Sequence, residues 1–326
     1  MKAVVTGGAG FIGSHLIDLL LDQGHEVVAL DDLSTGSRAN LDRASAGPRF
    51  RLVEGSILDE DLVGSVTAGA DVVFHLAAAV GVHLIVDHPL RSLRTNLYGT
   101  EVVLDAAVRH GCRLLLASTS EVYGKNDADG LHEDADRILG SPLKSRWSYA
   151  AAKGLDELLT YTYGQEHGLR AAIVRLFNIV GPRQTGRYGM VVPRFVGQAL
   201  TGRPITIYGD GQQRRCFGSV HDVVPAMVTL ACEPRAEGQV FNLGGREETT
   251  IGALAHRVRE LTGSPSAITH VPYDEAYGPG YEDMRRRMPD TTRAHELIGY
   301  KASRDLDDII ISITDSLRAP DRAVAT

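Results

Sequence analysis

The sequence predicts an α/β fold in which helices cover both faces of a parallel sheet, followed by a smaller α/β lobe. Two observations support this fold class. Strand-like runs alternate with helical patterns through the first half of the 326 residues, which is typical of βαβ units. The runs Val-Val-Phe at 72–74 and Leu-Leu-Leu at 114–116 are continuously apolar, as expected of parallel strands buried on both faces.

The elements of the first half follow from this alternation. The short runs rich in β-branched or apolar residues predict strands at Lys2–Thr6, Glu26–Leu30, Arg49–Glu54, Asp71–Leu76, Arg113–Ala117 and Arg170–Arg175. Helical patterns lie between some of these strands, and two of them stop at glycines, Gly24 and Gly111. These patterns predict helices at Ser14–Gln23, Asn96–His110 and Tyr149–Gly164.

The character of the sequence changes after Phe177, where Gly181–Met190 is rich in Gly, Arg and Gln and is expected to be a loop. We predict one further strand and four helices, at Pro204–Tyr208 and at Pro193–Gly202, His221–Cys232, Ile251–Thr262 and Thr291–Ile298. The expected domains are therefore residues 1–176, with a return segment near 213–240, and residues 177–326.

Composition limits the function classes. The net charge of −7 argues against nucleic acid or an anionic membrane as the main partner. No run of about 20 apolar residues is present, and the chain enters a strand-like run directly after Met1, so we expect no signal peptide. Three widely spaced cysteines indicate neither a disulfide framework nor a metal site. We expect a cytoplasmic protein.

A glycine-rich turn follows the first strand and opens the first helix. Gly7, Gly10 and Gly13 have the spacing that allows a tight turn, a close approach to a pyrophosphate and close packing of helix on strand. Acidic residues, Asp31 and Asp32, end the second strand about 20 residues later, as dinucleotide sites require. A carboxylate there accepts hydrogen bonds from a ribose and repels a 2′-phosphate, so NAD is favoured over NADP.

A tyrosine and a lysine lie one helical turn apart. Tyr149 and Lys153 stand at i and i+4 in Tyr-Ala-Ala-Ala-Lys, and so share one helix face. An ammonium group at that position is expected to lower the pKa of the tyrosine and make it a general base. The same pair is common on solvated helices, but here it follows a dinucleotide loop and the hydroxyl-rich Ser118-Thr119-Ser120.

Together these motifs resemble the extended short-chain dehydrogenase/reductase superfamily of nucleotide-sugar epimerases, dehydratases and decarboxylases. The resemblance rests on TGGAGFIG, HLAA at 75–78, STSEVYG at 118–124, YAAAK, RLFNIVGPR at 175–183 and GDGQQRRCF at 209–217. It implies a Rossmann-like, doubly wound sheet of seven strands, a tightly held NAD and a nucleotide-sugar lobe. It also implies that Thr119 holds the sugar hydroxyl, that Tyr149 removes its proton and that Lys153 holds the nicotinamide ribose.

The resemblance implies further cofactor contacts. Besides the glycines, aspartates and the Tyr–Lys pair, they are expected at Phe11, Ile12, Ser56, Ile57, Leu76, Ala77, Ala78 and Asn96. Ser56 stands near the position where an adenine-binding Asp is usual in the family, so this contact departs from the pattern. Arg38 leaves a possibility of NADP open.

The residues after Thr119 distinguish branches of the family. Ser120-Glu121 is similar to UDP-glucuronic acid decarboxylases, whereas 4,6-dehydratases carry Asp-Glu. The segment 277–290 resembles the decarboxylase segment with a catalytic arginine before x-Pro, which assigns that role to Arg287. Glu121 could orient the sugar or water, and Arg287 could bind the carboxylate or stabilise an enolate. A solvated basic run or diphosphate clamps remain the alternative for Arg285–Arg287, and a surface or helix-capping carboxylate remains the alternative for Glu121.

The remaining substrate contacts are also implied by the resemblance. We expect the UDP-sugar to meet Ser120, Asn178, Val192, Arg187, Tyr208, Arg215 and Arg287. Arg215 is placed at the diphosphate, which a guanidinium binds bidentately, and Cys216 replaces an Asp found in many members. Arg183 and Arg187 could close over the ligand or be solvated loop residues.

These observations predict NAD-dependent decarboxylation of UDP-glucuronate through a 4-keto intermediate, giving UDP-xylose or a UDP-4-keto-pentose. A 4-epimerase acting on UDP-glucuronate or a UDP-hexose is the alternative, and Glu121 is the main reason to rank it second. A non-catalytic NAD-binding sensor is a third interpretation, although it would be expected to lack Tyr149 or Lys153. The resemblance also implies a homodimer formed through the helices at 96–110 and 149–164.

Overall fold

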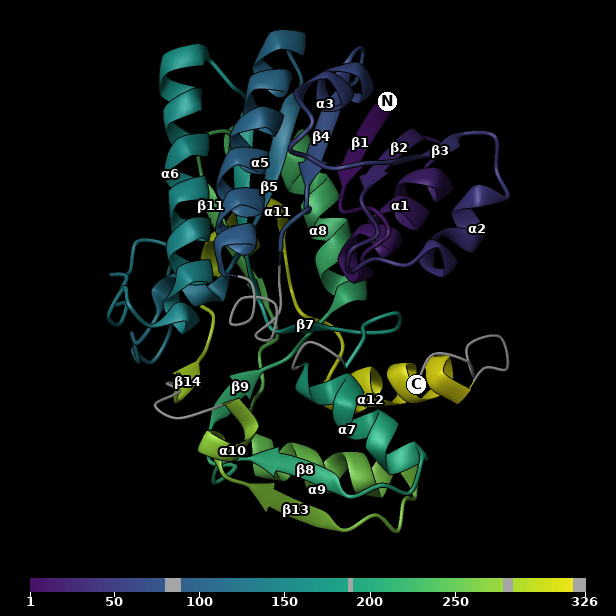
Figure 1. Cartoon of the computed structure of the whole chain (residues 1–326), viewed down its shortest axis with the longest axis vertical. Helices are drawn as coiled ribbons and strands as arrows, with labels where there is room; N and C mark the ends of the chain where they lie inside the picture. The colour runs from purple at the N-terminus through teal and green to yellow at the C-terminus, as the bar shows by residue number, and fades with distance from the viewer. Residues whose placement is uncertain (80–88, 187–189, 278–283, 319–326) are drawn as a thin grey trace.

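The computed structural model describes residues 1–79, 89–186, 190–277 and 284–318. It contains a large parallel sheet with helices on both sides, above a smaller lobe (Figure 1). The strands of the large sheet lie in the order β11-β6-β5-β4-β1-β2-β3. Their bounds are β1 (Lys2–Thr6), β2 (Glu26–Asp31), β3 (Phe50–Glu54), β4 (Val72–His75), β5 (Arg113–Thr119), β6 (Ala171–Phe177) and β11 (Val240–Gly244). The Rossmann-like, doubly wound fold is confirmed.

Alternation along each strand divides the core between the two faces of the sheet. On β1, Ala3 and Val5 belong to a cluster with the helices α1 (Phe11–Asp22) and α8 (Val220–Cys232). Val4 points to the other face and joins a cluster with the helices α3 (Glu60–Thr67) and α5 (Pro89–His110). Strands buried on both sides account for the continuous apolar runs of the sequence. The long helix α6 (Ser148–His167) packs beside α5 (Figure 1).

Strand order creates the crevice at which doubly wound proteins bind ligands. The chain runs from β1 outward through β2 and β3, then returns to pair β4 with the other edge of β1. The connections that follow β1 and β4 therefore diverge at the carboxyl ends of these strands, which is the switch point of the sheet.

The smaller lobe is made of short sheets and three main helices. It pairs β8 (Ile205–Tyr208) with β13 (Ile268–Val271), and it places β9 (Arg214–Cys216) between β12 (Glu248–Thr250) and β14 (Arg286–Arg287). Its core is a separate apolar cluster. The helices are α7 (Val191–Leu200), α9 (Ile251–Thr262) and α12 (Leu306–Arg318).

Short elements complete the described chain. The short strands β7 (Ile179–Val180) and β10 (Gly218–Ser219) pair in parallel between the lobes. Strand β10 leads directly into α8. The other short helices are η1 (Arg38–Leu41), α2 (Asp42–Ser45), η2 (Ser120–Tyr123), η3 (Ser145–Trp147), η4 (Pro234–Ala236), α10 (Tyr273–Tyr277) and α11 (Thr292–Ile298).

Most predicted elements lie within a few residues of the observed ones. The helix predicted at 221–232 is observed as α8, and it lies beside α1 of the first half. Several elements were missed, most of them short strands and helices of two to five residues. Among the longer ones, α3 is short, α12 was not recognised near the end of the chain, and the seventh strand of the large sheet, β11, carries a polar Asn242 in its centre. The domain boundary near residue 176 stays a prediction.

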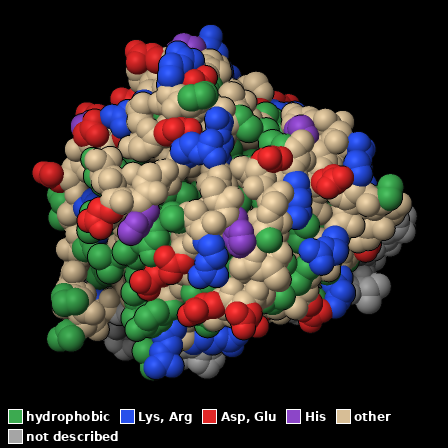
Figure 2. All heavy atoms as spheres, turned by 90° about the horizontal axis from the view of Figure 1, so that it is seen from above, with side chains coloured by type: hydrophobic (Ala, Val, Ile, Leu, Met, Phe, Trp, Pro, Cys, Tyr) green, Lys and Arg blue, Asp and Glu red, His purple; other side chains and the backbone are tan. Residues whose placement is uncertain are grey.

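The surface is mixed in charge on the face seen from above, where acidic and basic side chains alternate without a patch of one sign (Figure 2). No helix in the described part of the chain is both long and apolar enough to cross a membrane.

Candidate functional site

The glycine-rich turn lies at the switch point and is closely packed. Gly7 has a φ of +71°, and a Cβ there would lie 2.8 Å from the backbone N of Ala77. A Cβ on Gly13 would lie 2.3 Å from the carbonyl oxygen of Gly7. Gly10 is the N-cap of α1 and supplies no side chain to its first N–H groups. Phe11 and Ile12 begin the helix directly after it. The turn therefore fits a diphosphate at the helix N-terminus.

Asp31 ends β2 directly beside this turn. Its carboxylate accepts the N–H of Ala9 at 2.9 Å and the N–H of Leu33 at 2.8 Å. Burial raises the pKa of Asp31, and these two backbone hydrogen bonds oppose the rise. Arg38, which left NADP open, forms an ion pair with Glu54 on β3. This arrangement fits the ribose of NAD.

A cavity of about 370 Å³ lies next to these residues. Its lining includes Asp32 and Ser56, from the ends of β2 and β3, and Arg91, Arg94 and Thr95 of α5. The predicted Asp32 and Ser56 thus line one cavity that adjoins the dinucleotide turn. The side chain of Ile57 does not line this cavity, because it is buried against Gly99 of α5.

The segment after β4 approaches the same turn. Ala77 donates its N–H to Thr6 Oγ1 at 3.2 Å, so Leu76, Ala77 and Ala78 run beside Gly7. Asn96 is buried on α5 and accepts the N–H of Ala79 at 2.8 Å. In this structure Asn96 holds the segment after β4 in place from behind.

Tyr149 and Lys153 lie on the inner face of α6, and both are buried. The expected lowering of the tyrosine pKa is not seen: burial raises the pKa of Tyr149, and the negative charges of Glu121 and Asp156 raise it further. Burial is the main cause, and the pairing of Lys153 adds to it, because the Lys153 ammonium is 2.9 Å from Oδ2 of Asp156. The carboxylate offsets the positive charge that was expected to act on the phenol.

Glu121 lies between two arginines at the end of β5. Thr119 Oγ1 accepts the N–H of Glu121 at 3.2 Å and so caps η2. Arg146 forms a two-armed ion pair with the Glu121 carboxylate, one arm at 3.1 Å, and Arg287 donates to it at 3.0 Å. Burial alone would raise the pKa of Glu121, but the charges of Arg146 and Arg287 outweigh it and lower the pKa to about 2. Glu121 is therefore ionised, and the surface-carboxylate alternative does not describe it.

Arg146 is a site residue that the sequence reasoning did not single out. It lies in η3, three residues before Tyr149, and its side chain is 9% exposed. Its position one helical turn before a candidate general base could have indicated a place in the site. Its partner Glu121, 25 residues earlier in the chain, could not be read from that spacing.

Some of the predicted substrate contacts lie near Glu121, and others lie elsewhere. Arg287 lies 3.4 Å from Ser120 Oγ, and strand pairing sets Arg287 opposite the buried Arg215. The Asn178 side chain donates to the Cys216 carbonyl at 3.0 Å. Tyr208 stacks beneath Arg194, whose guanidinium lies 4.0 Å from the ring centre.

The other predicted contacts do not join this cluster. The side chain of Val192 is fully buried in the core of the smaller lobe. Arg183 forms an ion pair with Asp18 of α1, so this guanidinium bridges the lobes. Arg187 lies outside the described residues. Burial raises the pKa of the Cys216 thiol to about 12, so this thiol stays protonated.

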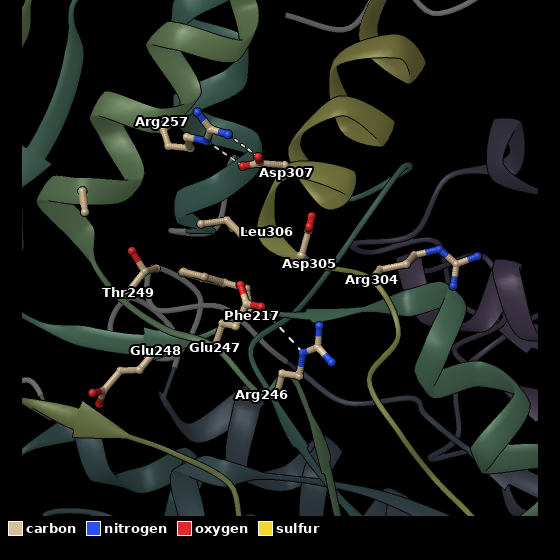
Figure 3. A pocket seen from close by; sticks show the side chains of 11 residues that line it. Phe217, Arg246, Glu247, Glu248, Thr249, Arg257, Arg304, Asp305, Leu306 and Asp307 are labelled. Carbon is tan, nitrogen blue, oxygen red and sulfur yellow. Dashed lines mark hydrogen bonds and ion pairs between the residues drawn. The ribbon is translucent and has the colours of Figure 1, made fainter.

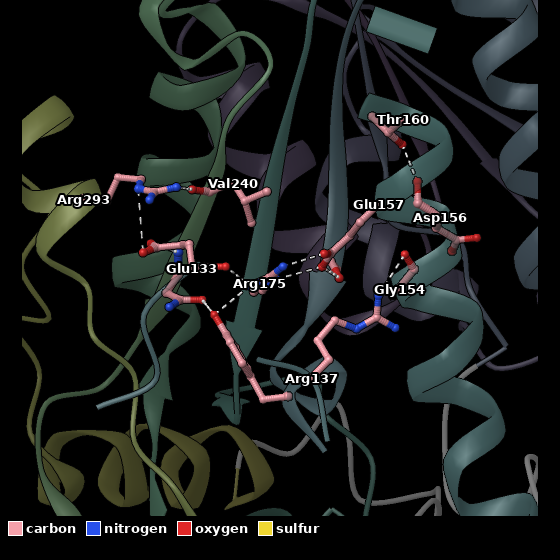
Figure 4. A network of polar contacts seen from close by, with 12 residues as sticks. Glu133, Arg137, Gly154, Asp156, Glu157, Thr160, Arg175, Val240 and Arg293 are labelled. Atoms are coloured by element: carbon pink, nitrogen blue, oxygen red, sulfur yellow. Dashed lines mark hydrogen bonds and ion pairs between the residues drawn. The ribbon is translucent and has the colours of Figure 1, made fainter. Parts of the chain in front are cut away.

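A buried polar network supports the site from within the larger lobe (Figure 4). Arg175 of β6 makes a two-armed ion pair with Glu157 of α6, at 3.0 and 2.7 Å. Arg175 also donates to the Tyr123 hydroxyl at 2.8 Å, and Ser118 donates to Glu157. These contacts fix α6, which carries Tyr149, against the ends of β5 and β6.

A second cavity of about 400 Å³ lies in the smaller lobe between α9, α12 and β12 (Figure 3). Acidic and basic side chains line it together, including the ion pair of Arg257 with Asp307. None of the predicted site residues lines this cavity.

Comparison with known proteins agrees with this geometry. Residues 3–244 match the NAD dependent epimerase/dehydratase family. A UDP-N-acetyl-alpha-D-glucosaminuronate decarboxylase of Bacillus cytotoxicus is 40% identical over 297 residues, 91% of each chain. UDP-glucuronic acid decarboxylase 1 of Xenopus tropicalis is 35% identical over 94% of this chain and 70% of its own length.

Solved structures of nucleotide-sugar epimerases and dehydratases are also similar to this chain. A UDP-glucose 4-epimerase of Thermotoga maritima, solved with UDP-glucose, is 32% identical, with a TM-score of 0.88 over 98% of this chain and 99% of its own. A dTDP-glucose 4,6-dehydratase of Streptomyces venezuelae, solved with NAD, is 30% identical, with a TM-score of 0.87 over 98% of this chain and 97% of its own. With the dinucleotide turn, the Tyr–Lys pair and the match over most of its length, the chain belongs to the NAD dependent epimerase/dehydratase family.

Proposed function

We propose that this protein is an NAD-dependent decarboxylase of UDP-glucuronic acid. The observation that carries the proposal is the ionised Glu121, held by Arg146 and Arg287 near Tyr149. The guanidinium of Arg287 can bind a substrate carboxylate, which is the group that a uronic acid carries. The relatives from Bacillus cytotoxicus and Xenopus tropicalis are named as decarboxylases of such sugars.

In this proposal Thr119 holds the C4 hydroxyl and Tyr149 accepts its proton, which requires the positive charge of a bound nicotinamide to offset the raised pKa of the phenol. NAD held by the glycine turn and Asp31 would supply the chemistry that the side chains lack, which is removal of a hydride from C4 and its later return. Oxidation at C4 turns the uronic acid into a β-keto acid. The C5 carboxylate then leaves as CO2, and the electron pair of the broken bond passes into the C4 ketone as an enolate.

Arg287 has two roles in this sequence. Its guanidinium binds the substrate carboxylate and then stabilises the enolate oxygen after CO2 has left. Arg146 stays on Glu121 and keeps this carboxylate ionised while Arg287 turns to the substrate. Protonation at C5 gives the 4-keto-pentose, and return of the hydride gives UDP-xylose.

The remaining assignments belong to the same proposal. Residues 1–176 with the return segment near 213–240 hold the dinucleotide, and residues 177–326 hold the UDP-sugar. The turn glycines Gly7, Gly10 and Gly13, with Asp31, Asp32 and Ser56, meet the cofactor, while Arg215 meets the diphosphate. The three cysteines are free, which suits the reducing cytoplasm.

We also propose a homodimer through α5 and α6. Large apolar side chains are exposed on these neighbouring helices, with Tyr98 61%, Leu155 48%, Leu158 58% and Tyr161 50% accessible. The last three lie at intervals of three residues on α6 and so share one side of the helix. An apolar surface of this kind suits a partner copy with the same helices.

The experiment that tests the function is incubation of the protein and NAD with UDP-glucuronate, followed by mass spectrometry and NMR. A product lighter by the mass of CO2 is expected. A product of unchanged mass with inverted C4 would replace the proposal with 4-epimerisation, the activity of the Thermotoga maritima relative. UDP-N-acetylglucosaminuronate tests the neighbouring substrate, and UDP-glucose, which lacks a carboxylate, is the matched control.

A further inference from the structure

Asp156 is a buried carboxylate that the reaction as described does not use. It lies on α6 three residues after Lys153, and both side chains are almost fully buried. Its Oδ2 is 2.9 Å from the Lys153 ammonium. Its neighbour Glu157 turns the other way, toward Arg175, and Figure 4 shows the Asp156 carboxylate directed away from that pair. Asp156 is therefore not part of the Arg175 network.

A line of buried polar groups leads from the dinucleotide turn to Asp156. Thr6 Oγ1 at the end of β1 lies 2.8 Å from Nδ1 of His75, and Nε2 of His75 lies 3.1 Å from Oγ1 of Thr100 on α5. Burial lowers the pKa of His75 to about 3, so the ring is neutral. Thr100 in turn faces Asp156, where burial raises the pKa of the carboxyl and Thr100 opposes the rise. Polar groups of this kind are costly to bury without partners, and the Lys153 ammonium is the charged partner that the structure gives the Asp156 carboxylate.

We propose that Asp156 is a positioning residue of this site, which holds the Lys153 ammonium through a buried ion pair and offsets its charge at Tyr149. The inference rests on the proposed function, because it concerns the base that starts the reaction. Lys153 does not act on Tyr149 as a lone cation. The pair of Lys153 and Asp156 contributes to the electrostatic potential at the phenol, beside burial and the charge of Glu121.

The direction of the effect follows from charge. Burial raises the pKa of Asp156, and the Lys153 ammonium opposes this and favours the ionised form. A negative charge near Tyr149 disfavours the phenolate, and Asp156 is among the groups that raise the Tyr149 pKa. Seven residues of helix separate the two side chains by about 10 Å, so removing this charge is expected to lower the Tyr149 pKa by about one unit.

The other groups around the pair come from every neighbouring element. They are Glu157 on α6, His75 on β4, Thr100 on α5 and Glu121 on η2. Glu157 forms its ion pair with Arg175, and Glu121 forms its ion pairs with Arg146 and Arg287. His75 is neutral. Asp156 is the member whose charge acts directly on Lys153.

The test compares wild type with Asp156→Asn in the full chain loaded with NAD. The pH profile of kcat/KM for UDP-glucuronate is measured, and the acid limb is expected to move about one unit lower in the variant. Glu166→Gln, an exposed carboxylate on the same helix, is the matched control and should leave the limb in place. Asp156→Ala provides a second uncharged variant. An unmoved acid limb in a folded variant overturns the proposal, and so does unfolding of both variants, which would make Asp156 a purely structural residue.

A second readout needs neither substrate nor cofactor. In protein labelled with ¹⁵N-lysine, the protected ammonium of Lys153 should give a slowly exchanging signal, assigned by its loss in Lys153→Met. This signal is expected to disappear in Asp156→Asn and to persist in Glu166→Gln. If it is unchanged in Asp156→Asn, the ion pair does not hold Lys153. If wild type leaves UDP-glucuronate unchanged, the proposed function fails while this spectrum still tests Asp156.

Discussion

Arg287 donates a hydrogen bond of 3.0 Å to the Glu121 carboxylate, although 166 residues separate them. The contact is possible because β14 adds to β9 and brings Arg287 opposite Arg215. It joins the end of β5 in the larger lobe to a strand of the smaller lobe. The two charged residues on which the decarboxylase prediction rests are therefore in contact in this structure.

Arg287→Ala is expected to slow CO2 release about 10²- to 10³-fold, because the developing enolate loses a preorganised cationic donor. NAD binding should be unchanged, since the dinucleotide turn lies elsewhere. Single-turnover CO2 release and calorimetric NAD titration measure the two effects. Arg286→Ala is the matched control, because Arg286 pairs with Glu248 and Asp129 instead. If Arg287→Ala weakened NAD binding as strongly as it slowed CO2 release, the catalytic role of Arg287 would be rejected.

Glu121→Gln is expected to lower the free energy of unfolding at pH 7 by about 3 kcal/mol. The folded pKa of Glu121 is about 2 against an ordinary value of 4.5, and each unit corresponds to about 1.4 kcal/mol. Because the folded pKa is depressed, this stability is present above about pH 4.5 and is lost as pH falls toward 2. The difference from wild type should therefore shrink by about 1 kcal/mol at pH 4.

Denaturant unfolding at pH 7 and pH 4 checks this prediction for Glu121. Glu247→Gln is the control, because Glu247 forms an exposed pair with Arg246 at 3.6 Å and exposed pairs contribute about 0–1 kcal/mol. A difference for Glu121→Gln that stays constant between the two pH values would show that the ionisation of Glu121 is not coupled to folding.

Local spacing explains what the sequence could predict. The turn glycines and the Tyr149–Lys153 pair lie within single elements, so their geometry follows from strand, turn and helix periods. The partners of Glu121 come from η3 and β14, and no local period links them. Likewise, Asp156 is close in sequence, but its burial beside Lys153 depends on Thr100 and His75 of other elements. Tertiary packing therefore decided the tyrosine pKa against the local rule.

Tyr149→Phe is expected to abolish NADH formation, with a loss of about 10²- to 10⁴-fold, because the variant keeps the ring and lacks the base. Absorbance of the reduced nicotinamide after mixing with UDP-glucuronate measures it. Tyr98→Phe removes a hydroxyl from an exposed tyrosine of α5 and serves as control. Full NADH formation in Tyr149→Phe would assign the base to another group.

Gly13→Ala is expected to weaken NAD binding and to destabilise the fold, because the new Cβ would lie 2.3 Å from the Gly7 carbonyl oxygen and must push the turn away. Gly197→Ala in α7 is the matched control: a Cβ there meets nothing within 4 Å, and alanine in a helix is favoured by about 0.5–1 kcal/mol. Thermal unfolding and NAD titration should separate the two variants. Wild-type NAD affinity in Gly13→Ala would show that the turn does not bind the diphosphate.

Leu158→Asp is expected to convert the proposed dimer into a monomer. Leu158 is 58% exposed on α6, between Leu155 and Tyr161, so a partner copy would bury it and a carboxylate there would lose its hydration. Light scattering should give about twice 35.1 kDa for wild type and about 35.1 kDa for the variant. Ile311→Asp on α12, where the side chain is 46% exposed, should leave the mass unchanged. A wild-type mass of one chain, or a dimer broken only by Ile311→Asp, would place the interface elsewhere.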